Sequence, residues 1–113
     1  LEIMNTLKNK VQLIGNLGND PEITNFESGK ILAKFSIATN DSYKNAQGEK
    51  ITDTQWHNVV AWGKTAQIVE KYITKGKEVA IEGKLTSRSW EDKDGMKRYV
   101  TEVVCNELLM LGK

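Results

Sequence analysis

Apolar and polar residues alternate with a period of two along most of the chain, which is the pattern of β-strands that bury one face. Val11, Leu13 and Gly15 share one side of a first strand, which glycines and a proline end between Gly15 and Pro21. A short extended piece follows at about 22–26. The remaining alternating runs predict four long strands, at about 31–40, 51–62, 79–90 and 97–109.

Two of these strands have clearly apolar faces, which we expect to line a core. Polar turns separate the strands at 28–30, 45–50 and 92–95, where glycine occurs with Asn, Asp or Ser. Lys34 lies on the opposite, non-core face of the second strand. The residues expected to point inward are Ile31, Ala33, Phe35, Ile37 and Thr39 in the second strand, and Val79, Ile81, Gly83 and Leu85 in the fourth.

The period changes only once, within Gly63–Lys75. There Ile68, Val69, Tyr72 and Ile73 fall on one helical stripe, and Gly76 is a typical helix stop. We therefore predict one helix that buries this stripe, Tyr72 included.

The order is three strands, a helix and two strands. A single helix cannot cover both faces of a parallel sheet, and long strands in a small chain should curl and close. We predict an all-β chain, a five-stranded Greek-key OB-fold barrel with one α-helix between strands 3 and 4. Residues 1–113 form one domain, in which residues 1–3 are expected to be additions ahead of a natural start at Met4.

Composition agrees with one globular domain and excludes several functions. The chain has 113 residues, of which 39% are hydrophobic, and its 16 Lys and Arg nearly balance 15 Asp and Glu. Net charge therefore does not indicate a polyanionic partner, and any basic surface must come from arrangement. No apolar run reaches the ~20 residues of a membrane span, so no membrane association is expected. One Cys and one His cannot form a common zinc site, so we expect no metal and no cofactor, and Cys105 should be a small buried side chain.

The tryptophans are the strongest functional signal. Trp56 and Trp62 are six residues apart, so they point to one face of an extended strand. Trp90 ends an alternating polar set that includes Lys84 and Arg88. Flat aromatic rings beside cationic residues suit single-stranded nucleic acid, because each base has a π-face and each nucleotide a charge. Core packing is the alternative for Trp56 and Trp62.

Seven segments of the chain, in order, carry a recognisable pattern. They are Lys10–Glu22, Phe35–Asn40, Trp56–Val60, Gly63–Lys64, Tyr72–Gly76, Ile81–Leu85 and Tyr99–Val104. Together these segments resemble bacterial single-stranded DNA-binding proteins. The resemblance implies a homotetramer of barrels that binds and protects single-stranded DNA without sequence preference in replication, recombination and repair. It also implies a non-enzymatic, cytoplasmic, nucleoid-associated protein.

The resemblance also assigns residues. Trp56, Trp62 and Trp90 match stacking positions of the family, and Tyr43 stands where many members have Trp. Alternation alone would place Tyr43 on the core face, so a bulge or bend must re-aim it. In the family, the histidine that matches His57 lies at a subunit contact, so the resemblance implies the same for His57, with simple surface as the alternative. The candidate phosphate contacts are Lys10, Lys34, Lys44, Lys64, Lys75, Lys84, Arg88, Lys97 and Arg98.

Other features stay open. Phe26 is either structural or part of the binding face, whereas Tyr99 is expected to be structural. Glu78 and Leu109 replace family glutamines near subunit contacts. No acidic tail precedes Lys113, so the chain is either a trimmed core domain or one that lost its tail, and replication and repair proteins are expected as partners only if a tail exists.

Two rival functions remain. One is an OB-fold adaptor that binds RNA or protein, because a fold alone does not fix function. The other is an enzyme such as a nuclease. His57 has no companion residues that would make an acid–base pair, which argues against catalysis.

Overall fold

The strands predicted from alternation are present in the computed structural model, which describes residues 7–112. The expectations for residues 1–3 and Met4 therefore lie outside the described residues. The elements in chain order are β1 (Val11–Leu17), β2 (Glu22–Asn25), β3 (Ile31–Lys44), β4 (Lys50–Trp62), α2 (Gly63–Tyr72), β5 (Glu78–Glu91) and β6 (Lys97–Leu111).

Five of the strands close into a barrel. β1 pairs with β5, β5 with β6 and β4 with β3, all antiparallel, and the end of β1 returns to β3 at Asn16 and Leu17. A short parallel pairing of β4 with β6 around Val59 and Val103 completes the ring. β2 lies outside it and, within residues 7–112, pairs only with β3. The predicted five-stranded barrel, with its helix between the third and fourth barrel strands, is confirmed.

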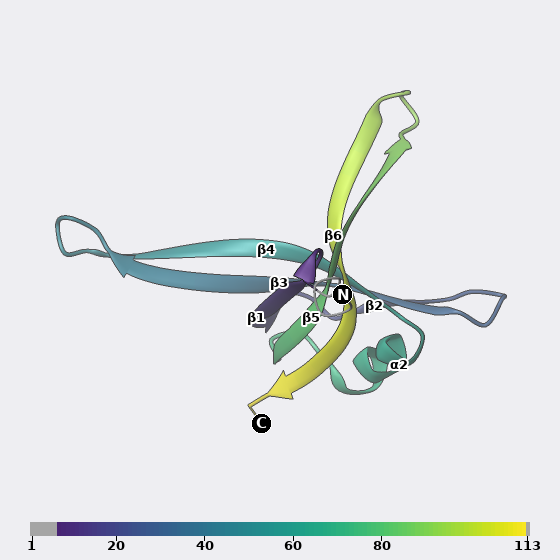
Figure 1. Cartoon of the computed structure of the whole chain (residues 1–113), viewed down its shortest axis with the longest axis horizontal. Helices are drawn as coiled ribbons and strands as arrows, with labels where there is room; N and C mark the ends of the chain where they lie inside the picture. Colours follow the sequence, from purple (N-terminus) through teal and green to yellow (C-terminus); the bar gives the residue numbers. More distant parts are fainter. Residues whose placement is uncertain (1–6, 113) are drawn as a thin grey trace.

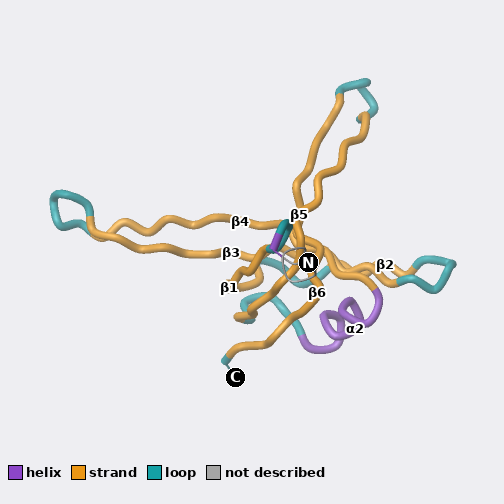
Figure 2. The backbone as a smooth tube through the Cα atoms, in the orientation of Figure 1, coloured by secondary structure: helices purple, strands orange, loops and turns teal. Residues whose placement is uncertain are grey.

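Two hairpins continue far beyond this barrel. β3 with β4, and β5 with β6, leave it in different directions as long two-stranded arms (Figure 1). Each arm ends in a short loop (Figure 2) that contains a glycine with positive φ, Gly48 at 81° and Gly95 at 78°. Both faces of an arm meet solvent, because no core lies beneath it. The prediction that Leu85 points into the core is therefore wrong, because Leu85 lies where β5 leaves the barrel and is 47% exposed.

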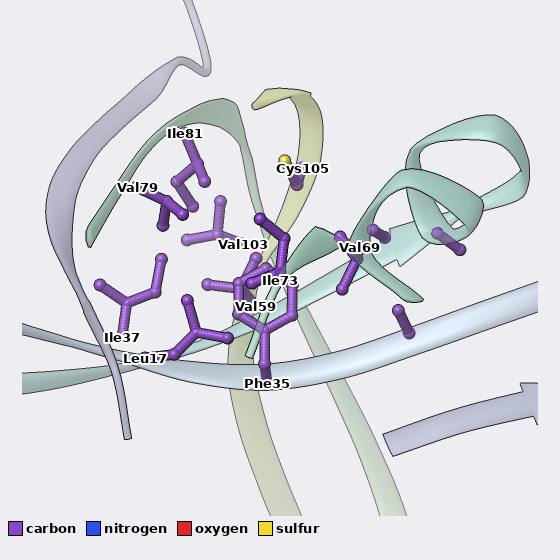
Figure 3. Close-up of a cluster of buried hydrophobic side chains, with 13 residues drawn as sticks. Leu17, Phe35, Ile37, Val59, Val69, Ile73, Val79, Ile81, Val103 and Cys105 are labelled. Atoms are coloured by element: carbon purple, nitrogen blue, oxygen red, sulfur yellow. The ribbon is translucent and has the colours of Figure 1, made fainter. Parts of the chain in front are cut away.

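The core fills the barrel and the space between the barrel and α2 (Figure 3). Phe35 and Cys105 are each 4% exposed, which confirms both as buried. Alternation holds in β3, where Lys34 is exposed between two buried residues. The buried cluster comprises Leu17, Ala33, Phe35, Ile37, Val59, Ala61, Ala66, Val69, Ile73, Val79, Ile81, Val103 and Cys105.

The helix buries half of the predicted stripe. Val69 and Ile73 are buried as predicted, together with Ala66, whereas Ile68 and Tyr72 are 45% and 48% exposed. Ala66, Val69 and Ile73 are three and four residues apart, so they share one face, and Ile68 and Tyr72 lie beside it. The helix also ends at Tyr72 rather than Lys75. The prediction of Tyr72 as a core residue is wrong.

Candidate nucleic-acid interface

Trp56 and Trp62 lie on the outer face of the β3–β4 hairpin. The register of the two strands is unbroken, with Trp56 opposite Ala38 and Trp62 opposite Leu32. Both indoles point away from the barrel interior and are 62% and 45% exposed. Lys34 lies on the same face of β3, between the two tryptophans in register. The predicted shared face of the two tryptophans is confirmed, and they are not core residues.

The indole of Trp56 rests on the glycine that ends the first strand. A Cβ on Gly18 would overlap Cζ3 of the Trp56 ring. The Gly18 N–H donates to the Ser36 carbonyl (3.0 Å), and Asn19 Oδ1 accepts from the Ser36 N–H (3.1 Å) and hydroxyl (2.8 Å). A Cβ on Gly15 would likewise overlap the backbone of β3. The glycine run therefore closes β1 against β3 and forms a seat for Trp56.

Trp62 stacks on Phe26, a residue for which the sequence left two readings open. The ring centroids lie 6.0 Å apart with an interplanar angle of 21°. Phe26 is 43% exposed and is fixed by the turn between β2 and β3, where its N–H donates to the Lys30 carbonyl (2.9 Å). The two exposed rings therefore form a stacked aromatic pair. The only sequence signal was the position of Phe26 in a loop near the ligand face of this fold.

A groove separates this face from the polar face of the β5–β6 arm. Two adjoining hollows of about 350 and about 300 Å³ lie along it, and both are lined by Lys34, Arg88 and Glu102. Trp62 lines the second. Arg88 Nε donates to Glu102 Oε1 (3.0 Å), and its Cζ lies 5.3 Å from the ring centroid of Trp90, which is 44% exposed. The structure therefore brings Trp62, Lys34 and Arg88 to one groove, and Arg88 links that groove to Trp90.

Two other candidate phosphate contacts are held in ion pairs. Lys10 lies 3.3 Å from Glu82, and Arg98 lies 2.8 Å from Asp92. The hydrogen bond from Arg98, with those from backbone N–H groups of the turn, lowers the pKa of Asp92. A hydrogen bond from Gln12, followed by Lys10, lowers the pKa of Glu82. Glu82 and Asp92 therefore stay ionised and offset the charge of Lys10 and Arg98.

The remaining lysines are dispersed. Lys84 lies on the same face of β5 as Arg88, as alternation predicted. Lys44 ends β3 at the tip of its arm, whereas Lys97 places Nζ 5.7 Å from the Tyr99 ring centroid. Lys64 lines a separate hollow on α2, and Lys75 follows that helix. The structure does not bring Lys64 or Lys75 to the groove.

Tyr43 does not share the face of Trp56. It lies opposite Ile51, on the side of the β3–β4 hairpin that carries His57. Tyr43 is 57% exposed, although no register shift interrupts the pairing of β3 with β4. Of the two causes expected, a bulge or a bend, the bulge is absent, and Tyr43 is exposed because its arm has left the core.

His57 is half-buried on β4, with Nε2 3.0 Å from the hydroxyl of Thr39. Within residues 7–112, no group of three His, Cys, Asp or Glu side chains is placed to hold a metal ion. None of the helices in that range is long and apolar enough to cross a membrane.

Comparison with known proteins agrees with this geometry. The chain is 50% identical over 105 residues to single-stranded DNA-binding protein 1 of Chlorobaculum tepidum, covering 92% of this chain and 65% of that protein. It is 47% identical over 106 residues to single-stranded DNA-binding protein 1 of Xylella fastidiosa, covering 93% and 78%. The structure matches Plasmodium falciparum SSB in complex with ssDNA, with a TM-score of 0.85, 29% identity and 95% and 97% coverage. The family model described as the single-strand binding protein family matches residues 8–111, and the chain belongs to that family.

Proposed function

We propose that this protein binds single-stranded DNA without sequence preference and protects it during replication, recombination and repair. The observation that carries this proposal is the exposed pair Trp56 and Trp62 on one face, with the cation of Lys34 between them in register. Base stacking on such rings contributes roughly 1–3 kcal/mol per base and tolerates any sequence. A duplex hides its base faces and should bind poorly.

The groove suggests a path for the strand. Bases would stack on Trp56 and on the joined rings of Trp62 and Phe26, and the phosphates would then pass Lys34 and Arg88 toward Trp90. Each phosphate neutralised by a cation adds a salt-dependent contribution to affinity. Tyr43 would extend the path along the β3–β4 arm on its other face. The candidate phosphate contacts for which the groove offers less support are Lys10, Lys44, Lys64, Lys75, Lys84, Lys97 and Arg98.

We infer a homotetramer, as family resemblance implies. The outer face of β1, β5 and β6 supports this inference, because Ile14 and Leu109, which both align with Ala80 in register, are 60% and 63% exposed there. A hollow of about 690 Å³, lined by Ile14, Ile68 and Leu109 among others, adjoins this face. Exposed apolar patches of this kind mark contact surfaces. Several barrels on one strand would raise the effective concentration of each further contact.

We also infer a binding protein rather than an enzyme, acting in the bacterial cytoplasm at the nucleoid. The chemistry of the groove supports binding, since rings and cations hold bases and phosphates without reacting with them. Recruitment of replication and repair proteins through an acidic tip would require sequence beyond Lys113. The chain spans about two thirds of the Chlorobaculum tepidum relative, 65% of its length.

The test is a titration of intrinsic tryptophan fluorescence with oligo-dT and with duplex DNA of equal length, at low and high salt. We expect strong quenching by the single strand that survives salt, and little by the duplex. Trp56→Ala and Trp90→Ala should each weaken binding by at least ~1 kcal/mol with the fold retained.

Tyr72→Ala is the matched control. Tyr72 is also an exposed ring with a lysine, Lys71, over it, but it lies on α2 and not at the groove. Absence of quenching by any DNA would overturn the proposal. Preference for RNA, or binding of neither nucleic acid, would favour an adaptor for RNA or protein.

A further inference from the structure

The β5–β6 arm carries a second face that the groove does not use. The register of the two strands is unbroken beyond Gly83. Trp90 lies opposite Arg98, so both side chains point to one side of the arm. Tyr99 lies opposite Ser89, one residue along each strand, and therefore points to the other side.

Tyr99 is poorly explained as a structural residue. It is 71% exposed, the highest value among the large apolar and aromatic side chains in the described part of the chain. Its neighbour on the same strand face, Lys97, places Nζ 5.7 Å from the ring centroid. Arg88 and Arg98 on the first face are held by carboxylates, whereas no carboxylate lies within ion-pair distance of Lys97 among residues 7–112. Glu91 is the cross-strand partner of Lys97 on this face, but the two form no ion pair, and Lys97 lies over the Tyr99 ring. The pair is therefore an exposed ring beside a cation that no carboxylate holds.

The surroundings of the ring leave room for a ligand. Ser89 is the cross-strand neighbour of Tyr99, and the next pair along the face is Ser87 with Thr101, whose hydroxyls lie 3.2 Å apart. These side chains are short and polar, so the ring projects above them. A flat base can stack on such a ring, and the phosphate of the same nucleotide can reach a nearby ammonium group.

We propose that Tyr99 and Lys97 form a second single-strand subsite on the reverse face of the β5–β6 arm, where one base stacks on Tyr99 and its phosphate pairs with Lys97. This inference rests on the proposed function. Because the subsite lies behind the arm from Trp90, a strand must pass around the arm to occupy both faces. Only a long strand engages it together with the groove.

The test compares oligo-dT of about 8 nucleotides, which is within the footprint of one barrel, with oligo-dT of about 40 nucleotides. Tyr99→Ala should weaken binding of the long strand about fivefold or more and leave the short strand unchanged, and Tyr99→Phe should bind both as the parent protein does. Lys97→Gln should lower the salt slope for the long strand by about 0.7. Thr101→Ala, on the same face, is the matched control and should change neither affinity.

A direct readout is photocrosslinking with long oligonucleotides that contain 5-iododeoxyuridine, which reacts with aromatic rings stacked on it. We expect a crosslinked peptide that contains Tyr99, and its loss in Tyr99→Ala. If the parent protein binds the long strand but Tyr99→Ala binds it equally, the subsite is wrong and the proposed function stands. If Tyr99→Ala changes the sedimentation of the DNA-free protein, Tyr99 is a subunit contact and the subsite is also wrong. If the parent protein binds no single strand, the proposed function itself fails.

Discussion

The indole of Trp56 lies across Gly18, at a distance that leaves no room for a side chain there. Gly18 is held against β3 by its hydrogen bond to the Ser36 carbonyl, so it cannot simply move away. The end of β1 thus lies against the Cζ3–Cη2 edge of the ring, while Trp56 as a whole is 62% exposed. A ring held at one edge loses less freedom when a base stacks on it.

Replacing Gly18 with Ala should therefore displace the Trp56 ring and weaken single-strand binding. We expect a loss of about 1 kcal/mol, near the lower bound for one stacked base, measured by fluorescence titration. A double-mutant cycle supplies the control: in a Trp56→Ala background, Gly18→Ala should have no further effect on affinity. Equal losses in both backgrounds would show that Gly18 acts through the fold and not through Trp56, and thermal unfolding of each variant would record that damage.

Glu102 holds Arg88 in the groove and offsets its charge. Glu102→Gln keeps an acceptor for Arg88 Nε but removes the negative charge beside Arg88 and Lys34. We expect severalfold tighter binding to oligo-dT at low salt, a steeper salt slope by up to about 0.7, and convergence with the parent protein at high salt. Glu70→Gln on the exposed side of α2 changes net charge equally and should have little effect. If the two variants behave alike, the effect comes from net charge rather than from the groove.

His57 tests the proposed assembly. A lysine at this half-buried position would lose the contact with Thr39 and place a charge in the proposed subunit interface, which costs several kcal/mol when unpaired. We expect His57→Lys to sediment as smaller species than the parent protein, and the uncharged His57→Gln to stay assembled. A tetramer that survives the lysine would place His57 outside the interface.

Cys105 predicts a pH dependence of stability. Burial raises the pKa of this thiol from 9.0 to about 11, because the core disfavours the thiolate. Below pH 9 the thiol is neutral in both folded and unfolded chains, so its contribution is fully present there. Between pH 9 and 11 the unfolded chain loses its proton first, so this contribution falls by up to about 1.4 kcal/mol per pH unit.

The measurement is chemical unfolding at several pH values for the parent protein and Cys105→Ala. The parent protein should lose stability more steeply than Cys105→Ala above pH 9, and its thiol should react with a disulfide reagent only after unfolding. Parallel pH profiles, or rapid reaction of the native thiol, would contradict the assignment.

Alternation predicted what depends on local pattern. It placed the strands, the buried Phe35 and the shared outward face of Trp56 and Trp62, because each follows from which side of one strand is apolar. Alternation predicted the burial of Leu85 and Tyr43 incorrectly, because the pattern of a strand does not show at which residue the strand leaves the barrel. In the helix the apolar pattern identified Val69 and Ile73 but not Ile68 and Tyr72, because the apolar residues fit two overlapping stripes and the one that includes Ala66 is buried.

The candidate site was predictable only in part. The aromatic residues that the sequence singled out could be found from spacing and composition. The Phe26–Trp62 stack and the Arg88–Glu102 pair join segments that are far apart along the chain, and each forms only when different hairpins meet. The contact of Gly18 with Trp56 could not be predicted either, because a glycine at this position indicates only that a strand ends there.

The two long arms have a further consequence for the temperature dependence of binding. A two-stranded ribbon without a core beneath it is only marginally stable in water, whereas the barrel is held by the buried cluster (Figure 1). Trp90 and Tyr99 are therefore carried by the part of the molecule that opens most readily. Affinity for single-stranded DNA should therefore decline on warming before the barrel melts, because binding must then refold an arm that has opened. Faster exchange of the amide hydrogens of the arms should accompany this decline. Single-stranded DNA would then act as the missing layer that the arms lack on their own.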